Sequence, residues 1–327
     1  MPVAEAITDR KPEETRSLRR TLDTAQFAAL GVNWRKSPAS AISVALRTKK
    51  DKDSPWSPWH VTTAEETGGT GDRDGTGLIW TGPATKVDVV VTTLRGPAPE
   101  QVRSELIDPG RRAADAEQQI PKVALKAGNA QLNVRNRAAW GADEKKMTWK
   151  PEYTPKVNAV VIHHTATTTD YKADQVPAIL RSIYRYQAVE RGWGDIGYNI
   201  VVDKFGRAWE GRAGGVAKAV VGAHAAGFNR GTVGITLIGN YVNSAPTKQA
   251  LDTLSQAIAY KLGPPKIDPT STINLSGGPG PRFKSPVTIK VPAVIGHYDV
   301  GRTACPGKNL DAALPKLRQQ AKTILSA

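Results

Sequence analysis

The sequence predicts a small all-β, sandwich-like domain followed by a larger α/β domain. Two observations lead to this fold class: short runs with period-two alternation fill residues 28–94, and strand-like and helical runs mix after residue 131. We expect a flexible segment at 1–22, the all-β domain at 23–108, a linker at 109–130 and the α/β domain at 131–327.

Alternating runs at 42–48, 57–63, 77–82 and 86–94 predict the antiparallel strands of the first domain. Turn-forming clusters such as TGGTGDRDGTG (67–77) separate these runs. Trp56, Trp59 and Trp80 are expected in the core of so small a sheet, and a sugar-stacking platform is the alternative. The linker is assigned because residues 109–130 show neither a clear period nor an aromatic residue.

Elements of the second domain follow in order along the chain. The run NAVVIHHT (158–165) predicts a buried strand, and 176–192 carries a helical apolar stripe. Residues 197–212 predict a hairpin that turns at DKFG, and 231–241 a second buried strand. A helix is expected after an N-cap at Thr247, and a last helix at 310–325. The Gly/Pro-rich stretch 268–289 predicts a surface loop or β-excursion.

Charge and composition restrict the class of partner. The chain carries 45 Lys and Arg against 30 Asp and Glu, a net charge of +15, and most of the excess lies after residue 130. Such a basic surface suits a polyanion, and a nucleic acid is disfavoured because no basic helix, RNA-binding motif or zinc-finger spacing is present. There is no apolar run of about 18 residues, and the charged N-terminus does not read as a signal peptide.

Histidine and cysteine together indicate a metal site. The single cysteine, Cys305, excludes an intramolecular disulfide and follows His297 by eight residues. Imidazole and thiolate are preferred zinc ligands, and a catalytic zinc takes three protein ligands. One histidine from each of two strands plus Cys305 meets that number. Because neighbouring side chains of a strand point to opposite faces, only one of His163 and His164 can take part, and periodicity does not say which.

Four motifs in this order carry a resemblance: VVIHHTAT, DIGYNIVVDKFGRAWEGR, VGAHAAGFNRGTVGITLIGNY and IGHYDVGRTACPG. Together they closely resemble the zinc-dependent N-acetylmuramoyl-L-alanine amidases of the peptidoglycan recognition protein family, and NRAAWGADE (136–144) resembles the start of that domain. The likeness covers residue 134 to the end and implies a mixed β-sheet flanked by helices. The N-terminal β region resembles the extra domain of actinobacterial members.

The resemblance also implies roles for individual residues. The implied zinc ligands are His163, His297 and Cys305. Tyr198 and Thr303 are the implied catalytic residues, and the implied substrate-binding residues are His164, His224 and Asn229. Family members that bind peptidoglycan without cutting it typically lack the cysteine, so Cys305 favours an enzyme.

The expected function is zinc-dependent hydrolysis of the amide bond between N-acetylmuramic acid and L-alanine in peptidoglycan. We expect a monomer, secreted or at the cell wall, that contacts peptidoglycan and anionic wall polymers but neither nucleic acid nor an integral membrane. One alternative is a non-catalytic peptidoglycan receptor or scaffold with a structural zinc. Another is a carbohydrate-binding module that acts through Trp56 and Trp59. Stem-peptide preference stays open, because AGGVAKAVVGAH replaces the aromatic pair of relatives.

Overall fold

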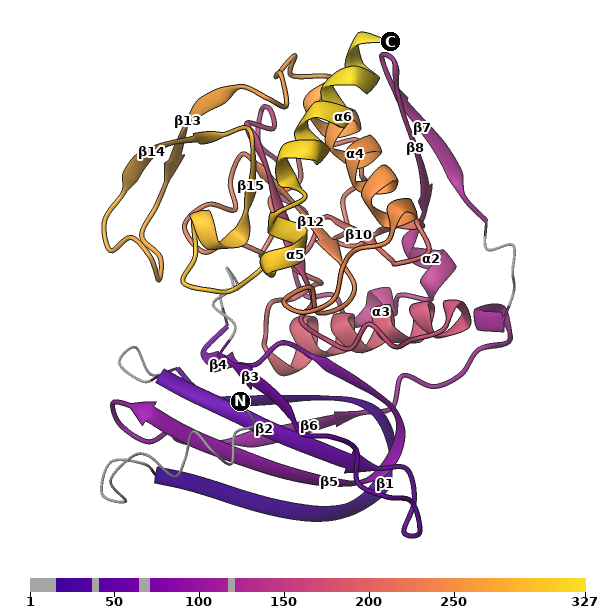
Figure 1. The fold of residues 1–327 in the computed structure, drawn as a ribbon, viewed down its shortest axis with the longest axis vertical. Helices are drawn as coiled ribbons and strands as arrows, with labels where there is room; N and C mark the ends of the chain where they lie inside the picture. Colours follow the sequence, from indigo (N-terminus) through magenta and orange to yellow (C-terminus); the bar gives the residue numbers. More distant parts are fainter. Residues whose placement is uncertain (1–15, 37–40, 65–70, 117–120) are drawn as a thin grey trace. The chain divides into compact units, whose positions relative to one another are not determined.

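The computed structural model describes residues 16–36, 41–64, 71–116 and 121–327 (Figure 1). Its contacts divide the chain into two compact units. Among the described residues, the first unit comprises 16–36, 41–64 and 71–110, and the second comprises 111–116 and 121–327.

The first unit is an all-β domain, as predicted. Its six-stranded antiparallel sheet has the order β3-β2-β5-β1-β4, with β6 also paired to β1. Register shifts between Asp23 and Ala29 interrupt the regular pairing of β1 with β5. The part of β1 from Phe27 onward lines an apolar core that includes Phe27 and Trp34, whereas residues 17–23 are exposed. The strands are β1 (Arg16–Arg35), β2 (Ala41–Lys49), β3 (His60–Thr63), β4 (Arg73–Gly75), β5 (Ile79–Arg95) and β6 (Arg103–Ile107).

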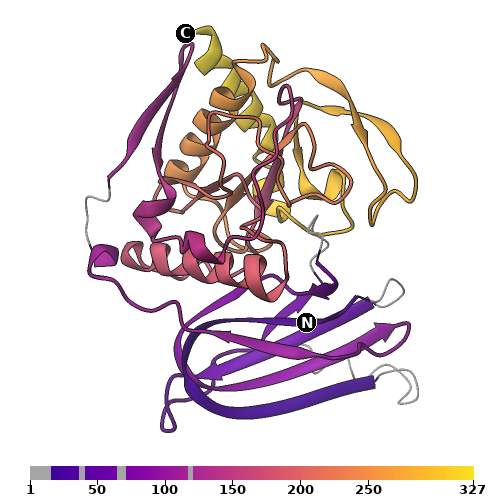
Figure 2. The same ribbon diagram turned by 180° about the vertical axis from the view of Figure 1, so that it is seen from behind.

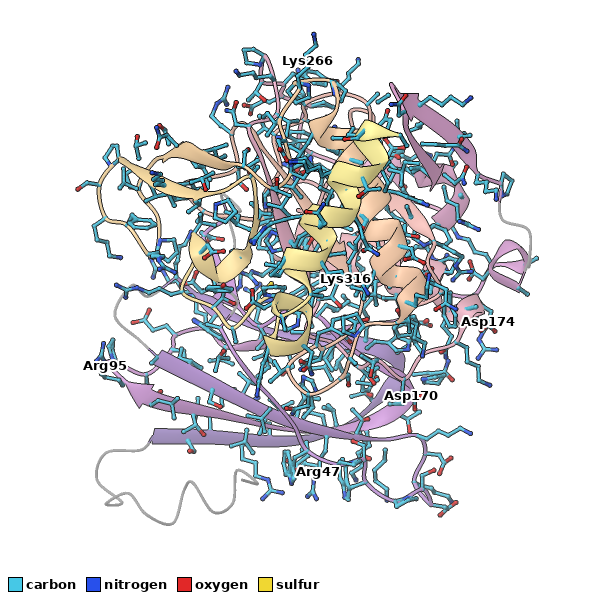
Figure 3. All side chains as sticks on the ribbon, turned by 45° about the horizontal axis from the view of Figure 1, so that its top comes forward. Arg47, Arg95, Asp170, Asp174, Lys266 and Lys316 are labelled. Atoms are coloured by element: carbon cyan, nitrogen blue, oxygen red, sulfur yellow. The ribbon has the colours of Figure 1, made fainter. Side chains whose placement is uncertain are left out.

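Two details of the first unit differ from the sequence-based expectations. The segment 1–22 was expected to be flexible, but β1 starts at Arg16 because residues 16–23 pair with β5; residues 1–15 lie outside the described part. Trp80 is buried as expected, whereas Trp56 is half-buried and Trp59 is 40% exposed. Both follow β2 and pack on Arg47, which is labelled in Figure 3 and whose guanidinium carbon lies 4.7 and 4.5 Å from their ring centroids.

The second unit is built on a mixed seven-stranded sheet of order β15-β9-β12-β10-β11-β8-β7. Strands β15, β9, β12 and β10 run parallel to one another, so their carboxyl ends share one edge. The predicted hairpin is confirmed as the antiparallel pair β10 and β11. The strands are β7 (Val123–Ala127), β8 (Ala130–Arg135), β9 (Ala159–His164), β10 (Ile200–Val202), β11 (Ala208–Glu210), β12 (Thr232–Leu237) and β15 (Val294–Gly296).

Helices cover one face of this sheet. Helices α4 (Lys248–Leu262) and α6 (Leu314–Ser326) lie side by side on it, and their apolar residues share a core with Val160 and Ile162 of β9 (Figures 1 and 2). The predicted N-cap is confirmed, since the Thr247 hydroxyl accepts a hydrogen bond from the amide of Ala250 at 3.2 Å. The remaining α-helices are α2 (Arg137–Trp140), α3 (Val176–Arg185), which continues as a π-helix to Glu190, and α5 (Lys308–Asp311).

A β-hairpin packs on the opposite face. Strands β13 (Thr272–Gly277) and β14 (Val287–Pro292) form this hairpin, which overlaps the predicted stretch 268–289 and extends three residues beyond it. Leu275 joins Val161 and Phe228 in a second core. The predicted linker 109–130 is corrected in its second half, because β7 pairs with β8 across a turn at Gly128. Within the described residues, no helix is long and apolar enough to cross a membrane.

Candidate metal centre

Strand β9 presents its two histidines to opposite faces of the sheet. His164 shares a face with Val160 and Ile162 beneath the helices, where its Nδ1 accepts a hydrogen bond from the amide of Tyr241 at 3.2 Å. His163 points to the other face, where its side chain lies close to those of His297 and Cys305. Of the two histidines, His163 is therefore the one on the face where His297 and Cys305 lie, a choice that periodicity left open.

The other two members come from the segment that follows β15. Strand β15 pairs in parallel with β9, so His297 begins a 3-10 helix directly beside the end of β9. The chain then folds back: the amide of Tyr298 donates to the carbonyl of Cys305 at 2.9 Å. Gly307 has φ of +88°, and a Cβ there would lie 2.5 Å from the backbone of Tyr241, so the turn after Cys305 requires glycine.

The side chains of His163, His297 and Cys305 converge at one point. Their ligand atoms all lie within 4.8 Å of one another, with 3.7 Å between His163 Nδ1 and Cys305 Sγ. The three residues are at most 7% exposed, and the buried Nε2 of His297 has no hydrogen-bond partner among the described residues. Two imidazoles and one thiol form the donor set that zinc prefers, so these residues fit a zinc ion.

Burial keeps the histidines of this cluster neutral. Burial lowers the pKa of His297 to about 3, assisted by His164. The pKa of His163 is held well below its ordinary range by burial first and then by the neighbouring imidazoles, His297 foremost. Burial also lowers the pKa of His164 to about 4. A metal-binding imidazole must be deprotonated, so the cluster is ready for a metal at neutral pH.

Both residues expected to be catalytic lie next to the cluster. The ring of Tyr198 is buried and its centroid is 5.3 Å from that of His163. Thr303 is half-buried, and its hydroxyl oxygen accepts a hydrogen bond from the amide of Cys305 at 3.1 Å. The structure therefore brings together the three expected ligands and the two expected catalytic residues.

The expected substrate-binding residues are placed differently. His224 is wholly enclosed, with 0% exposure, and its Nδ1 lies 3.0 Å from Nε2 of His163, so it does not line an open groove. His164 is 5% exposed beneath the helices. Asn229 is half-buried, and its side-chain oxygen accepts the amides of His224 and Ala225 at 2.8 and 2.9 Å, which fixes the loop that carries His224.

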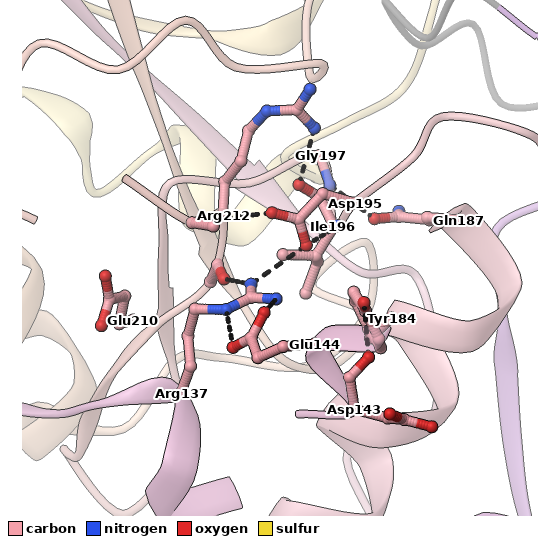
Figure 4. A network of polar contacts seen from close by, with 12 residues as sticks. Arg137, Asp143, Glu144, Tyr184, Gln187, Asp195, Ile196, Gly197, Glu210 and Arg212 are labelled. Carbon is pink, nitrogen blue, oxygen red and sulfur yellow. Dashed lines mark hydrogen bonds and ion pairs between the residues drawn. The ribbon is translucent and has the colours of Figure 1, made fainter. Parts of the chain in front are cut away.

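Sequence reasoning missed a buried ionic network in the segment that precedes Tyr198; Figure 4 shows its members Arg137 and Asp195. The carboxylate of Asp195 is fully buried; it accepts a hydrogen bond from Arg137 Nη1 at 3.0 Å and backbone amides of Ile196 and Ala213. Arg212 Nη1 donates to the carbonyl of Ile196 at 3.0 Å. Burial raises the pKa of Asp195, and Arg137 opposes that shift. Asp195 and Arg137 lie inside recognisable motifs, DIGYN and NRAAW, but nothing in those motifs indicated that the two would pair.

Comparisons with known proteins show which families and proteins this chain is similar to. Residues 153–308 match the family described as N-acetylmuramoyl-L-alanine amidase, and residues 2–120 match the family described as Rv3811 N-terminal galactose-binding domain-like. Peptidoglycan-recognition protein LB of Drosophila melanogaster is 29% identical over 60% of this chain and 74% of its own length. The N-acetylmuramoyl-L-alanine amidase of Homo sapiens is 31% identical over 54% of this chain but only 27% of its own length. A solved structure of wild-type Drosophila PGRP-LB is 30% identical, covers 55% of this chain and 91% of its own, and has a TM-score of 0.43.

Proposed function

We propose that the second unit, whose residues 153–308 match the N-acetylmuramoyl-L-alanine amidase family, has an amidase-type role and cuts peptidoglycan. The bond cut is the amide between N-acetylmuramic acid and L-alanine. The observation that supports this proposal best is the convergence of His163, His297 and Cys305 within 4.8 Å, next to Tyr198. The substrate lies outside the cytoplasm, so we infer that the protein acts there.

His163, His297 and Cys305 would hold the zinc ion. When bound, zinc supplies a Lewis acid and makes a water molecule nucleophilic near neutral pH. Two imidazoles and one thiolate would give the ion three protein ligands, the number that catalytic zinc sites use. This donor set supports the enzyme over the receptor with a structural zinc, because structural zinc sites use four protein ligands.

Tyr198 and Thr303 would carry the proton and charge movements. The phenol of Tyr198, beside His163, would orient the attacking water and hold a proton at its hydroxyl. The Thr303 hydroxyl oxygen accepts the amide of Cys305, so its own proton remains to be donated to the oxyanion that develops on the amide carbonyl. Removing one such donor commonly costs about 10²–10³ in rate.

A chelator experiment separates the enzyme from the receptor. Purified cell walls are incubated with full-length protein that has been treated with a chelator and then resupplied with zinc, beside a Cys305→Ser variant. We expect turbidity to fall only with the zinc-resupplied wild-type protein, and both proteins to bind walls. Wall binding without clearance by any sample, although zinc is bound, would favour the receptor.

A specific surface favours a second function for the first unit, binding of wall glycans. Trp59 is 40% exposed, and Arg47 stacks on it while it also pairs with the buried carboxylate of Asp88 at 2.9 Å. Arg19, whose side chain is 57% exposed, pairs with the same carboxylate from β1. An exposed indole beside fixed guanidinium groups suits a sugar ring that bears negative charge. The match to a galactose-binding domain-like family supports this proposal.

This second function is tested in the full chain with the Cys305→Ser substitution, so that walls are not degraded. Trp59→Ala is expected to weaken wall binding several-fold. Leu18→Ala is the matched control, since Leu18 is 56% exposed and, by strand alternation, faces away from Arg19. Equal binding by both variants would contradict a role for this face.

A further inference from the structure

His224 is enclosed next to one of the proposed zinc ligands. Its ring is 0% exposed and lies between two glycines, because a Cβ at Gly222 or at Gly234 would come within 2.4 Å of ring atoms. Neither glycine is among the residues with positive φ, so the reason for glycine here is space for the imidazole. The two glycines therefore leave the space that the His224 ring occupies.

Two hydrogen-bonded amide side chains fix the segment around this ring. Asn229 accepts the amide of His224 at 2.8 Å. Asn199 accepts the amide of Gly234 on β12 at 2.9 Å and donates to the carbonyl of Val220 at 3.0 Å, which ties the strand to the loop that carries His224. The imidazole is thus held at a defined place relative to β9 and β12.

The two ring nitrogens of His163 have different neighbours. Nδ1 lies 3.7 Å from Cys305 Sγ, on the side where the proposed ligands meet. Nε2 lies on the other side, 3.0 Å from Nδ1 of His224, and the two rings are nearly perpendicular at 82°. If Nδ1 of His163 binds the metal, Nε2 carries the proton and donates it to His224 Nδ1.

From this geometry we infer that His224 is a positioning residue of the metal centre. It accepts the Nε2 proton of His163 and so fixes the tautomer and ring orientation in which Nδ1 faces the metal. Metal-bound histidines usually donate that proton to a carboxylate, a carbonyl or water, and here a second imidazole takes their place. In this tautomer the proton of His224 sits on its own Nε2, which is buried without a hydrogen-bond partner among the described residues. Burying this N–H without a partner costs free energy that an apolar ring would avoid. The advantage of a histidine at this position is therefore the hydrogen-bond acceptor at its Nδ1.

Zinc affinity of the full chain, measured by competition with a chelator, tests the inference. His224→Phe fills the space without an acceptor, and we expect it to bind zinc about 10- to 100-fold more weakly than the wild type. His224→Asn keeps an acceptor oxygen near the position of Nδ1, and we expect it to restore most of the affinity. His60→Phe is the matched control, because His60 of the first unit is also partly buried and its Nε2 has no hydrogen-bond partner in the part of the chain that the structure describes.

The outcomes separate this inference from the metal centre on which it rests. Wild-type protein that binds no zinc would overturn the proposed centre and the inference with it. Zinc binding by His224→Phe as tight as by the wild type, or equal losses in the Phe and Asn variants, would overturn only the role of His224. Nitrogen-15 NMR of the zinc-loaded wild-type protein needs no variant: we expect the His163 proton on Nε2, and a proton on Nδ1 would contradict the inference.

Discussion

Burial lowers the pKa of the histidines in and around the proposed metal centre, so we expect the protein without metal to be sensitive to acid. Folding holds the pKa of His224 and His297 at about 3 and that of His164 at about 4, below the ordinary 6.5. Unfolded imidazoles therefore bind protons between pH 6.5 and about 4 while the folded ones do not. The free energy of unfolding must fall as the pH falls through this window.

Between pH 7 and pH 5, each of these histidines taken singly lowers the free energy of unfolding by about 2 kcal/mol. Denaturant unfolding of the chelated protein at pH 7 and pH 5 measures it. Equal free energies of unfolding at the two pH values would show that the histidines are not buried as the structure places them.

Tyr198 tests the proposed chemistry separately from metal binding. Tyr198→Phe removes only the hydroxyl, and the ring still packs beside His163. We expect kcat on peptidoglycan fragments to fall about 10²–10³-fold with zinc affinity within a few-fold of the wild type. An unchanged kcat would show that Tyr198 only packs in the core and takes no part in the reaction.

Among the elements, the segment before Tyr198 depends on a buried ion pair with α2. The Asp195 carboxylate is fully buried, whereas that of Glu144, the other partner of Arg137, is 52% exposed. Asp195→Ala leaves Arg137 buried without this partner, and we expect the second unit to lose about 3–5 kcal/mol of stability. Glu144→Ala is the matched control, with an expected loss of about 1 kcal/mol or less. Similar losses in both variants, measured by urea unfolding, would contradict the network's role.

Much of the second unit could be predicted because its elements carry strong local patterns. The strand with His163, the hairpin of β10 and β11, and helix α4 with its Thr247 cap follow from apolar runs, turn residues and an N-cap. Strand β7 was missed because it is an exposed edge strand without apolar alternation. The enclosure of His224 was missed as well, since Gly222 and Gly234 come from separate segments that only the tertiary fold brings together.

For the molecule as a whole, the division into two compact units predicts that zinc stabilises one unit and leaves the stability of the other unchanged. The proposed ligands all lie in the second unit, so a metal that binds only the folded state stabilises that unit. At a free zinc concentration 1,000 times Kd the gain is about 4 kcal/mol. We expect zinc to raise the temperature of one unfolding transition and to leave the other unchanged. Calorimetry of the full chain, chelated and zinc-loaded, measures both transitions. A shift of both transitions would contradict a metal site confined to the second unit.

We propose that the centre of His163, His297 and Cys305 cuts the bond between the sugar and the stem peptide. Mass spectrometry of purified muropeptides after incubation with zinc-loaded protein tests it most directly, with chelated protein and Cys305→Ala as controls. We predict free stem peptides that begin with L-alanine, formed only by the zinc-loaded wild-type protein. Intact muropeptides in every sample, although zinc is bound, would contradict the claim.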